Sequence, residues 1–156
     1  MNESSSVVVL LAAHNGMRWI ESQIDSIVNQ DIVDVDIYIS VDKSNDGTFE
    51  WCSNLAMKNP NIQVLPYGGI FGGAAKNFYR LIKDVDFNRY DYVAFSDQDD
   101  IWDSSKLSFA IDKIKCNNLD AYSSDVIAFW SSGKEVLIKK SYPQKRFDYF
   151  FGRRRR

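Results

Sequence analysis

The 156-residue sequence is poor in several residue types that specialised proteins need: it has one histidine, two cysteines and three prolines, and its formal net charge is only −2. Cys52 and Cys116 lack the spacing of a metal site, so we interpret them as free thiols in a reducing compartment. His14 is the only partner available to a serine or cysteine nucleophile, and no nucleophile signature surrounds it. These scarcities argue against a disulfide-stapled domain and against a histidine-based catalytic triad.

A long hydrophobic run is also missing. The most obvious apolar stretch, Val7–Ala13, is far shorter than the roughly 20 residues that a bilayer crossing needs, and an acidic, serine-rich segment precedes it. We therefore expect no signal peptide and no membrane span, and the expected location is the cytoplasm.

Basic residues are scarce outside the C-terminal end. Four of the nineteen are Arg153–Arg156, and the rest of the chain carries a net charge of −6. A mildly acidic domain binds duplex nucleic acid poorly, because that affinity comes mostly from neutralised phosphates, so we expect no nucleic-acid partner. The arginine run has two open interpretations: a dock for anionic lipid or nucleic acid, which would give peripheral association at the inner membrane face, or a solubilising or artificial tail.

What the sequence does have is apolar and aromatic material, at 45% and 14% of the residues. This amount suits one sizeable core, so we expect a single domain over residues 1–152 followed by a basic tail at residues 153–156.

Short apolar runs typical of buried strands alternate with segments whose apolar residues recur every three or four positions. Strands are expected at Val7–Ala12, Val35–Val41, Ile62–Leu65 and Tyr92–Phe95, and helices at Arg18–Asn29, Thr48–Lys58, Ala74–Val85 and Ser104–Lys115, the last capped by Ser104. Val126–Trp130 and Glu135–Ile138 predict a hairpin, and Pro143–Phe151 one or two helical turns. The sequence thus predicts an α/β fold with a mostly parallel sheet between layers of helices and a small C-terminal hairpin.

Three carboxylates, Asp97, Asp99 and Asp100, follow the fourth strand. Ligands of parallel sheets lie outside the carboxyl ends of the strands. Like charges this close raise one another's pKa unless they share a cation, and such oxygen donors suit Mg²⁺ or Mn²⁺. An acidic turn that caps the next helix, through Asp103 or Ser104, is the alternative, and both interpretations stay open here.

Two further segments follow strand ends. Asp42 could accept hydrogen bonds from ring N–H groups or ribose hydroxyls of a ligand, although an Asp after a strand is often only a turn former, as Asp46-Gly47 is expected to be. The glycine-rich segment Gly68–Gly73 precedes a helix with Lys76 on its first turn, which suits a phosphate. It is neither a Walker loop nor a dinucleotide fingerprint, and a purely conformational role is the alternative.

Four segments, in order, resemble the nucleotide-binding half of family 2 glycosyltransferases with the GT-A fold. They are Val8–Gly16, Ser40–Thr48, Gly72–Phe78 and Phe95–Trp102, the last continued by Lys106-Leu107. Phe95–Trp102 is the most specific, because it resembles the Asp-x-Asp segment of the rhamnosyltransferase-like branch, which acts in bacterial polysaccharide assembly.

The resemblance implies a role for each of these segments. Asp42 would contact the base of a nucleoside-diphosphate sugar carried on uridine or thymidine diphosphate, with His14 packed near the base beside Asn15. Asp97 and Asp99 would border the diphosphate, with Asp99 the principal ligand of Mg²⁺ or Mn²⁺. The expected reaction is an inverting transfer to a saccharide or lipid-linked acceptor.

The sequence also departs from the family pattern. Val41 replaces the first acid of a usual pair, and Lys43 stands where glycine is common. The acceptor-binding half and the general base lie, in the family, beyond the end of this chain, so we expect a shortened relative; Asp125 and Asp148 are available acids without supporting surroundings.

Two other functions remain as alternatives. One is a binding module that keeps the nucleotide pocket without catalysis. The other is a phosphatase of the haloacid dehalogenase type, whose Asp-x-Asp nucleophile Asp97-Gln98-Asp99 imitates. Against the phosphatase, that motif normally ends the first strand, and the small Thr or Val expected after it is missing.

Overall fold

A computed structural model gives the structure, and it describes residues 4–130 and 132–140. The chain divides into two compact units, residues 1–111 and residues 112–156, each described here by itself. The expectation of one domain over residues 1–152 stays a prediction, and the helical turns expected at Pro143–Phe151 lie outside the described residues.

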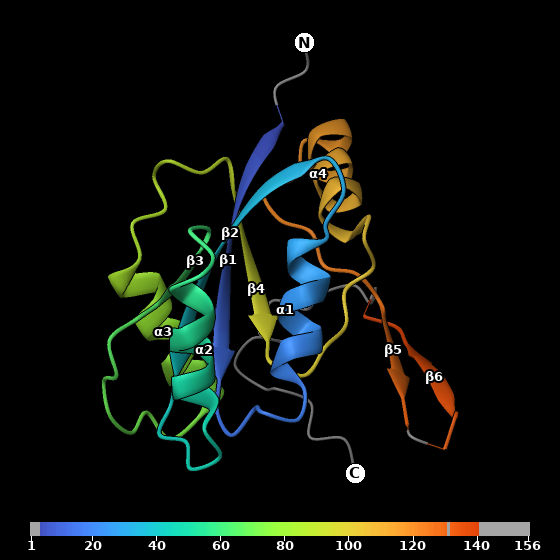
Figure 1. Ribbon diagram of the computed structural model, residues 1–156. Helices are drawn as coiled ribbons and strands as arrows, with labels where there is room; N and C mark the ends of the chain where they lie inside the picture. The colour runs from blue at the N-terminus through green and yellow to red at the C-terminus, as the bar shows by residue number, and fades with distance from the viewer. Residues whose placement is uncertain (1–3, 131, 141–156) are drawn as a thin grey trace. The chain divides into compact units, whose positions relative to one another are not determined.

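The first unit is built around four parallel strands separated by helices (Figure 1). In chain order these are β1 Ser5–Ala13, α1 Ile20–Val28, β2 Val33–Val41, α2 Thr48–Ala56, β3 Ile62–Val64, α3 Ala74–Asp84 and β4 Tyr92–Asp97. Helix α4, Lys106–Asn117, crosses the border between the units. The strand order is β3-β2-β1-β4, so every strand and helix predicted for this part is confirmed, with ends shifted by a few residues.

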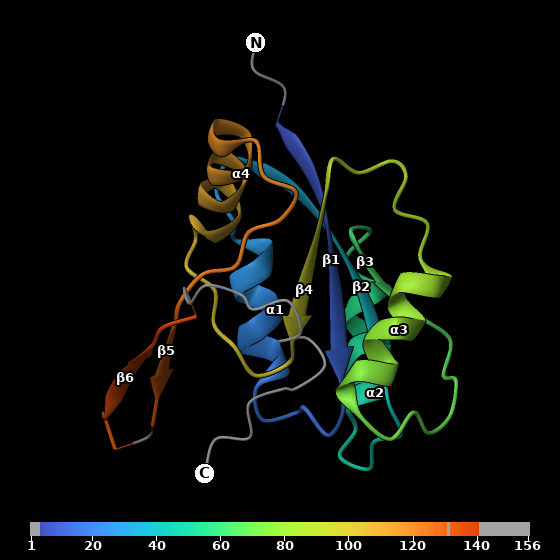
Figure 2. The ribbon, with the colours of Figure 1, turned by 180° about the vertical axis from the view of Figure 1, so that it is seen from behind.

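The sheet has two distinct faces because successive side chains of a strand point to opposite sides. Val7, Val9 and Leu11 of β1 join the core that α1 and α2 cover, which also takes in Trp102 and Leu107. The alternate β1 residues Val8, Leu10 and Ala12 pack with Leu81 and Val85 at α3. Helix α1 lies in front of the sheet in Figure 1, and α3 comes to the front in Figure 2. This arrangement is the predicted three-layer α/β architecture.

Helix α4 begins two residues later than the sequence suggested, and the expectation that Ser104 caps it was wrong. The Ser104 hydroxyl donates to Asp31 Oδ2 at 2.6 Å. Asp103 Oδ1 accepts from the Ser105 N–H in a local turn, and Gln30 Oε1 accepts the Leu107 N–H at 2.9 Å. Gln30, which is distant in sequence, therefore accepts the hydrogen bond from a first-turn N–H that a capping side chain would otherwise accept.

In the second unit, strands β5 (Val126–Phe129) and β6 (Glu135–Ile138) form an antiparallel hairpin, as predicted. Their register pairs Ile127 with Leu137 and Phe129 with Glu135. Within the described residues of both units, no helix has the length and apolar character to span a bilayer.

The central strand should dominate the stability of the first unit. Leu11 is fully buried, so Leu11→Ala should lower the free energy of unfolding by about 2–5 kcal/mol, measured by urea denaturation. Met57→Ala serves as the control, because Met57 is 81% exposed and its truncation should change stability by at most about 0.5 kcal/mol. Equal losses in the two variants would contradict a core assembled around β1.

Candidate functional site

The candidate site lies at the carboxyl ends of β2, β1 and β4. The register pairs Ala13 of β1 with Val41 of β2, and Ala12 with Asp97 of β4, so the three strands end at the same level. Neighbouring strands lie about 4.8 Å apart, and Asp42 lies two register positions beyond Asp97, so their backbones flank the exit of β1 at a separation of about 12 Å. The two acidic strand ends thus share one edge of the sheet.

Asp42 is 5% exposed, and its carboxylate is bound by backbone amides. Oδ1 accepts hydrogen bonds from the N–H groups of Lys43 at 2.7 Å and Phe71 at 2.8 Å, and Oδ2 accepts from Gly72 at 2.9 Å. Burial by itself raises the pKa of the Asp42 carboxyl, but hydrogen bonds from Phe71, Lys43, Gly72 and Gly73 outweigh it and hold that pKa below its ordinary value. Asp42 is therefore an ionised anchor for the glycine-rich loop.

Helix α3 holds the glycine-rich loop from the other side through Arg80. The guanidinium donates to the Ser40 hydroxyl at 3.2 Å and to the Pro66 carbonyl, and it lies 5.1 Å from the centre of the Phe71 ring. Gly72 has φ of 72°, in the left-handed region that favours glycine. The loop is thereby folded against Asp42, while Lys76 is exposed on the first turn of α3.

Asn77 of the same helix ties two strand ends together. Its side chain is 2% exposed, and Nδ2 donates to the carbonyls of Ser40 at 2.8 Å and Ala13 at 3.3 Å. Oδ1 of Asn77 is buried without a hydrogen-bond partner. The sequence placed Asn77 in a family-like segment, but only the structure shows that it joins β1 to β2.

The loop after β1 is bound to the loop after β2. Asn15 donates its backbone N–H to Ser44 Oγ, and its Oδ1 accepts the Asn45 N–H, both at 2.9 Å. Asn15 has φ of 48°, a conformation that asparagine tolerates better than most residues. The His14 side chain is exposed, with Nε2 3.3 Å from Asn15 Nδ2. His14 and Asn15 are thus brought beside the Asp42 loop.

Asp46 does more than form the expected turn with Gly47. Its Oδ2 accepts the Met17 N–H at 3.0 Å, and its Oδ1 accepts from the hydroxyl and the N–H of Thr48. Burial raises the pKa of the Asp46 carboxyl, but the bonds from Thr48 and Met17 outweigh it, so that pKa lies below its ordinary value. Asp46 therefore stabilises both the start of α2 and the approach to α1.

The β4 side of the site carries three exposed carboxylates, Asp97, Asp99 and Asp100. Between them, Gln98 turns its side chain back to β1: its Oε1 accepts the His14 N–H at 2.6 Å and its Nε2 donates to the His14 carbonyl at 2.7 Å. Sequence reasoning gave Gln98 no role, and its place between two acids was the one signal available.

Among residues 4–130 and 132–140, no group of three or more His, Cys, Asp or Glu side chains is gathered as a metal cage. Mg²⁺ commonly takes only one or two protein carboxylates and completes its shell with water and phosphate oxygens. Asp97 and Asp99 supply such hard oxygen donors at an open position, so the donor set fits a divalent cation of this kind.

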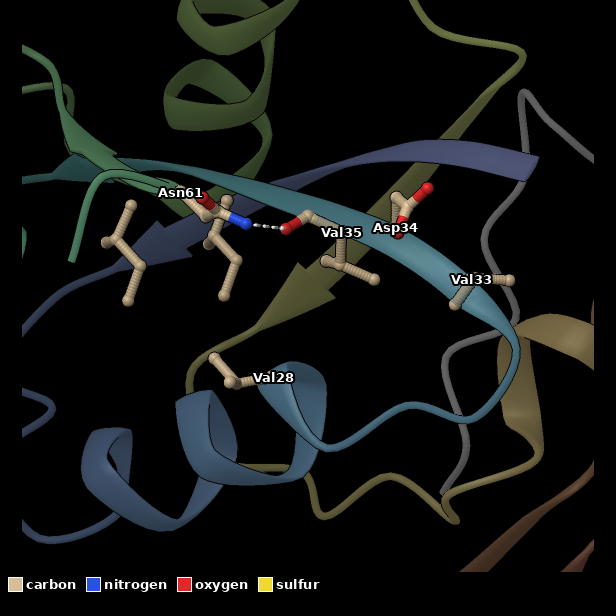
Figure 3. A pocket seen from close by; sticks show the side chains of 7 residues that line it. Val28, Val33, Asp34, Val35 and Asn61 are labelled. Carbon is tan, nitrogen blue, oxygen red and sulfur yellow. Dashed lines mark hydrogen bonds between the residues drawn. The ribbon is translucent and has the colours of Figure 1, made fainter. Parts of the chain in front are cut away.

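A hollow of about 190 Å³ lies elsewhere, against the first half of β2. Figure 3 shows Val28 of α1 across from Val35, with Asn61 donating a hydrogen bond to the Val35 carbonyl at 3.4 Å. At about 3.3 Å per residue, the eight positions from Asp34 to Asp42 span roughly 26 Å. The hollow is therefore separate from the acidic strand ends.

The sequence of this chain is similar to that of known glycosyl transferases. The model of a family described as glycosyl transferase family 2 matches residues 8–155. The chain is 51% identical over 142 residues to the dTDP-rhamnosyl transferase RfbG of Shigella flexneri, a match that covers 90% of this chain and 49% of that protein. The chain thus spans about half the length of this relative.

Two solved structures share the fold with a TM-score of 0.61 each. One is S. aureus TarS in complex with UDP-GlcNAc, 22% identical, with 72% of this chain and 32% of that chain covered. The other is the mannosyltransferase PcManGT from Pyrobaculum calidifontis in complex with GDP-Man and Mn²⁺, 19% identical, with 72% and 33% covered.

These likenesses confirm the predicted GT-A architecture, and the family match sets the phosphatase alternative aside. The family model matches nearly the whole chain, and the chain is 51% identical to the rhamnosyl transferase over the 142 aligned residues. This chain therefore belongs to glycosyl transferase family 2, in its rhamnosyltransferase-like branch.

Proposed function

We propose that this chain is the donor-binding part of an inverting glycosyltransferase that takes a sugar from a nucleoside diphosphate. The observation that carries the proposal is the shared edge of the sheet, where Asp42 lies on one side of β1 and Asp97 and Asp99 on the other. Two acidic positions about 12 Å apart suit a ligand with a ring N–H at one end and a diphosphate with its cation at the other.

The donor is a pyrimidine nucleotide sugar, with dTDP-rhamnose the first candidate. Support comes from the rhamnosyl transferase that shares half of its aligned residues with this chain, and from the UDP-GlcNAc complex of a protein with the same fold. Thymine and uracil each present one ring N–H between two carbonyls, and an ionised carboxylate is a good acceptor for that N–H.

Asp42 is the residue proposed to accept the base. A carboxylate has about four acceptor positions, and backbone amides of the loop and of Lys43 already fill three of them. Because Asp42 is only 5% exposed, a base N–H reaches Oδ2 only if the glycine-rich loop gives way, and the bond from Gly72 is then lost. Exchange of one N–H donor for another leaves the carboxylate satisfied, so the rearrangement costs little.

Asp97 and Asp99 are the proposed ligands of a divalent cation, Mg²⁺ or Mn²⁺, and Lys76 is a proposed phosphate contact at the start of α3. When bound, the cation supplies Lewis-acid stabilisation of the diphosphate leaving group. His14 and Asn15 are proposed to lie beside the base, with the exposed imidazole of His14 as a stacking surface.

The other substrate and the acid-base chemistry belong to the longer relatives. An inverting transfer needs a carboxylate to deprotonate the acceptor hydroxyl, and the surroundings of Asp125 in the described part of the chain do not single it out. We propose a saccharide or lipid-linked acceptor in bacterial surface polysaccharide synthesis, with the enzyme at the inner face of the membrane. Donor binding is the part of this activity that the present residues support.

The metal assignment can be tested by calorimetry with dTDP and MnCl₂. Asp99→Asn should weaken dTDP binding in Mn²⁺ by at least about tenfold. Mutation of residues that only support a metal ligand typically lowers metal affinity by about that factor, and loss of the ligand itself should cost no less. Asp100→Asn is the matched control, because it removes the same charge from the same exposed turn. Equal losses in both variants would mean that only the general negative charge matters.

The role of Asp42 predicts a particular pH dependence. Its pKa lies below the ordinary 3.8, so the acceptor form should persist across neutral and mildly acidic pH. Thymidine binding, followed by NMR so that no phosphate titrates, should be constant from pH 8 to about pH 5 and decline only below about pH 4. A decline centred near pH 6 would contradict Asp42 as the acceptor.

Donor hydrolysis measured beside binding separates the enzyme from a binding module. Release of sugar from dTDP-rhamnose that depends on Mn²⁺ and is lost in Asp99→Asn would support an active site in this chain. Binding of dTDP without hydrolysis or transfer would favour the binding module instead.

A further inference from the structure

The side chain of Gln98 pairs with a single backbone unit. A primary amide carries a donor and an acceptor, and Gln98 uses both on His14, at 2.7 Å to its carbonyl and 2.6 Å from its N–H. The ladder between β1 and β4 ends where Ala12 pairs with Asp97. The amide of Gln98 thereby continues this ladder into the turn that carries Asp99.

Gly16 provides the space in which this side chain lies. A Cβ atom at Gly16 would lie 2.5 Å from Gln98 Oε1 and 3.0 Å from its Cδ, distances that no side chain tolerates without a shift. Gly16 is not among the glycines with positive φ, so its backbone does not require glycine. The requirement at this position is room for Gln98.

The residue that Gln98 holds is itself joined to the Asp42 loop. From His14 the chain passes to Asn15, which bonds to Ser44 and Asn45. Ser44 Oγ in turn donates to the Asp42 carbonyl at 2.9 Å. Hydrogen bonds together with the peptide link between His14 and Asn15 therefore connect the Asp97–Asp99 turn to the backbone of Asp42.

We propose that Gln98 is a positioning residue that fixes the turn carrying Asp99, just beyond the end of β4, relative to the nucleobase subsite at Asp42. The inference rests on the proposed function, because it assigns the two subsites to one ligand. The oxygen and the nitrogen of the Gln98 amide each bond to His14, and these two bonds hold the turn against the loop after β1. Without it, Asp97 stays paired in the ladder, but the turn that carries Asp99 is no longer tied to the loop after β1.

Calorimetry of dTDP binding, with and without MnCl₂, tests this role in Gln98→Ala, Gly16→Ala and the double variant. Gly16→Ala displaces Gln98 without touching a carboxylate, and it keeps the backbone hydrogen bonds of residue 16. Each single variant should weaken dTDP binding in Mn²⁺ by about tenfold or more, the range typical of lost supporting contacts around a metal ligand. The double variant should lose no more than either single variant, because both remove the same contact.

Two controls distinguish positioning from general stability. Gln63→Ala changes an exposed glutamine on β3, away from the strand ends, and should leave every affinity unchanged. Gln98→Met keeps a side chain of similar length without charge or hydrogen-bonding amide, so it should behave like Gln98→Ala. In Gln63→Ala the melting temperature should stay within about 2 °C of the wild type, and in every variant the metal-free dTDP affinity should be unchanged.

The inference is overturned if Gln98→Ala binds dTDP in Mn²⁺ as the wild type does. It is equally overturned if affinity falls by the same factor with and without Mn²⁺, or only in step with the melting temperature, because a merely structural role gives those results. If the wild type itself binds no dTDP in either condition, the proposed function fails first, and that outcome is distinct from the other two.

Discussion

The parallel register of β2, β1 and β4 is the constraint on which the rest of the molecule depends. β1 is buried on both faces and pairs along its length with β2 and along most of it with β4, so the ends of all three strands are set by one ladder. A shift of one residue would reverse the faces of the strand and separate the strand ends. The relative position of Asp42 and Asp97 is therefore fixed by backbone pairing and core packing, far from any ligand.

At the carboxyl ends of β2, β1 and β4, polar side chains connect segments that are distant in sequence. Asn77 joins β1 to β2, Gln98 joins the β4 turn to β1, and Asn15 joins the two loops between them. These contacts supply hydrogen-bond partners to backbone groups at and beyond the ends of the strands, where ladder pairing stops. Asp42 binds the glycine-rich loop and is also the proposed acceptor for the base. Both roles are open to it, because its ionised carboxylate can accept hydrogen bonds from loop amides or from a ring N–H.

Sequence patterns predicted the elements of the fold well, since each depends on local periodicity. Apolar runs such as Val7–Ala12 located the strands, and the carboxyl-end rule placed Asp42 and Asp97 on one edge. The prediction that Ser104 caps α4 was wrong because Gln30, 77 positions before Leu107 in the sequence, accepts the Leu107 N–H. Gln98 and Arg80 could not be assigned for the same reason: their partners, His14 and Pro66, become neighbours only when the sheet forms.

One consequence concerns how such a site diversifies. Gln98 holds His14 by its peptide groups alone, and the imidazole remains exposed; Lys43 likewise donates its N–H to Asp42 while its side chain is exposed. These hydrogen bonds therefore involve only the backbone at the two positions and do not depend on which side chain is present. Substitutions at these two positions can therefore change the chemistry of the exposed surface at this edge without loosening the scaffold.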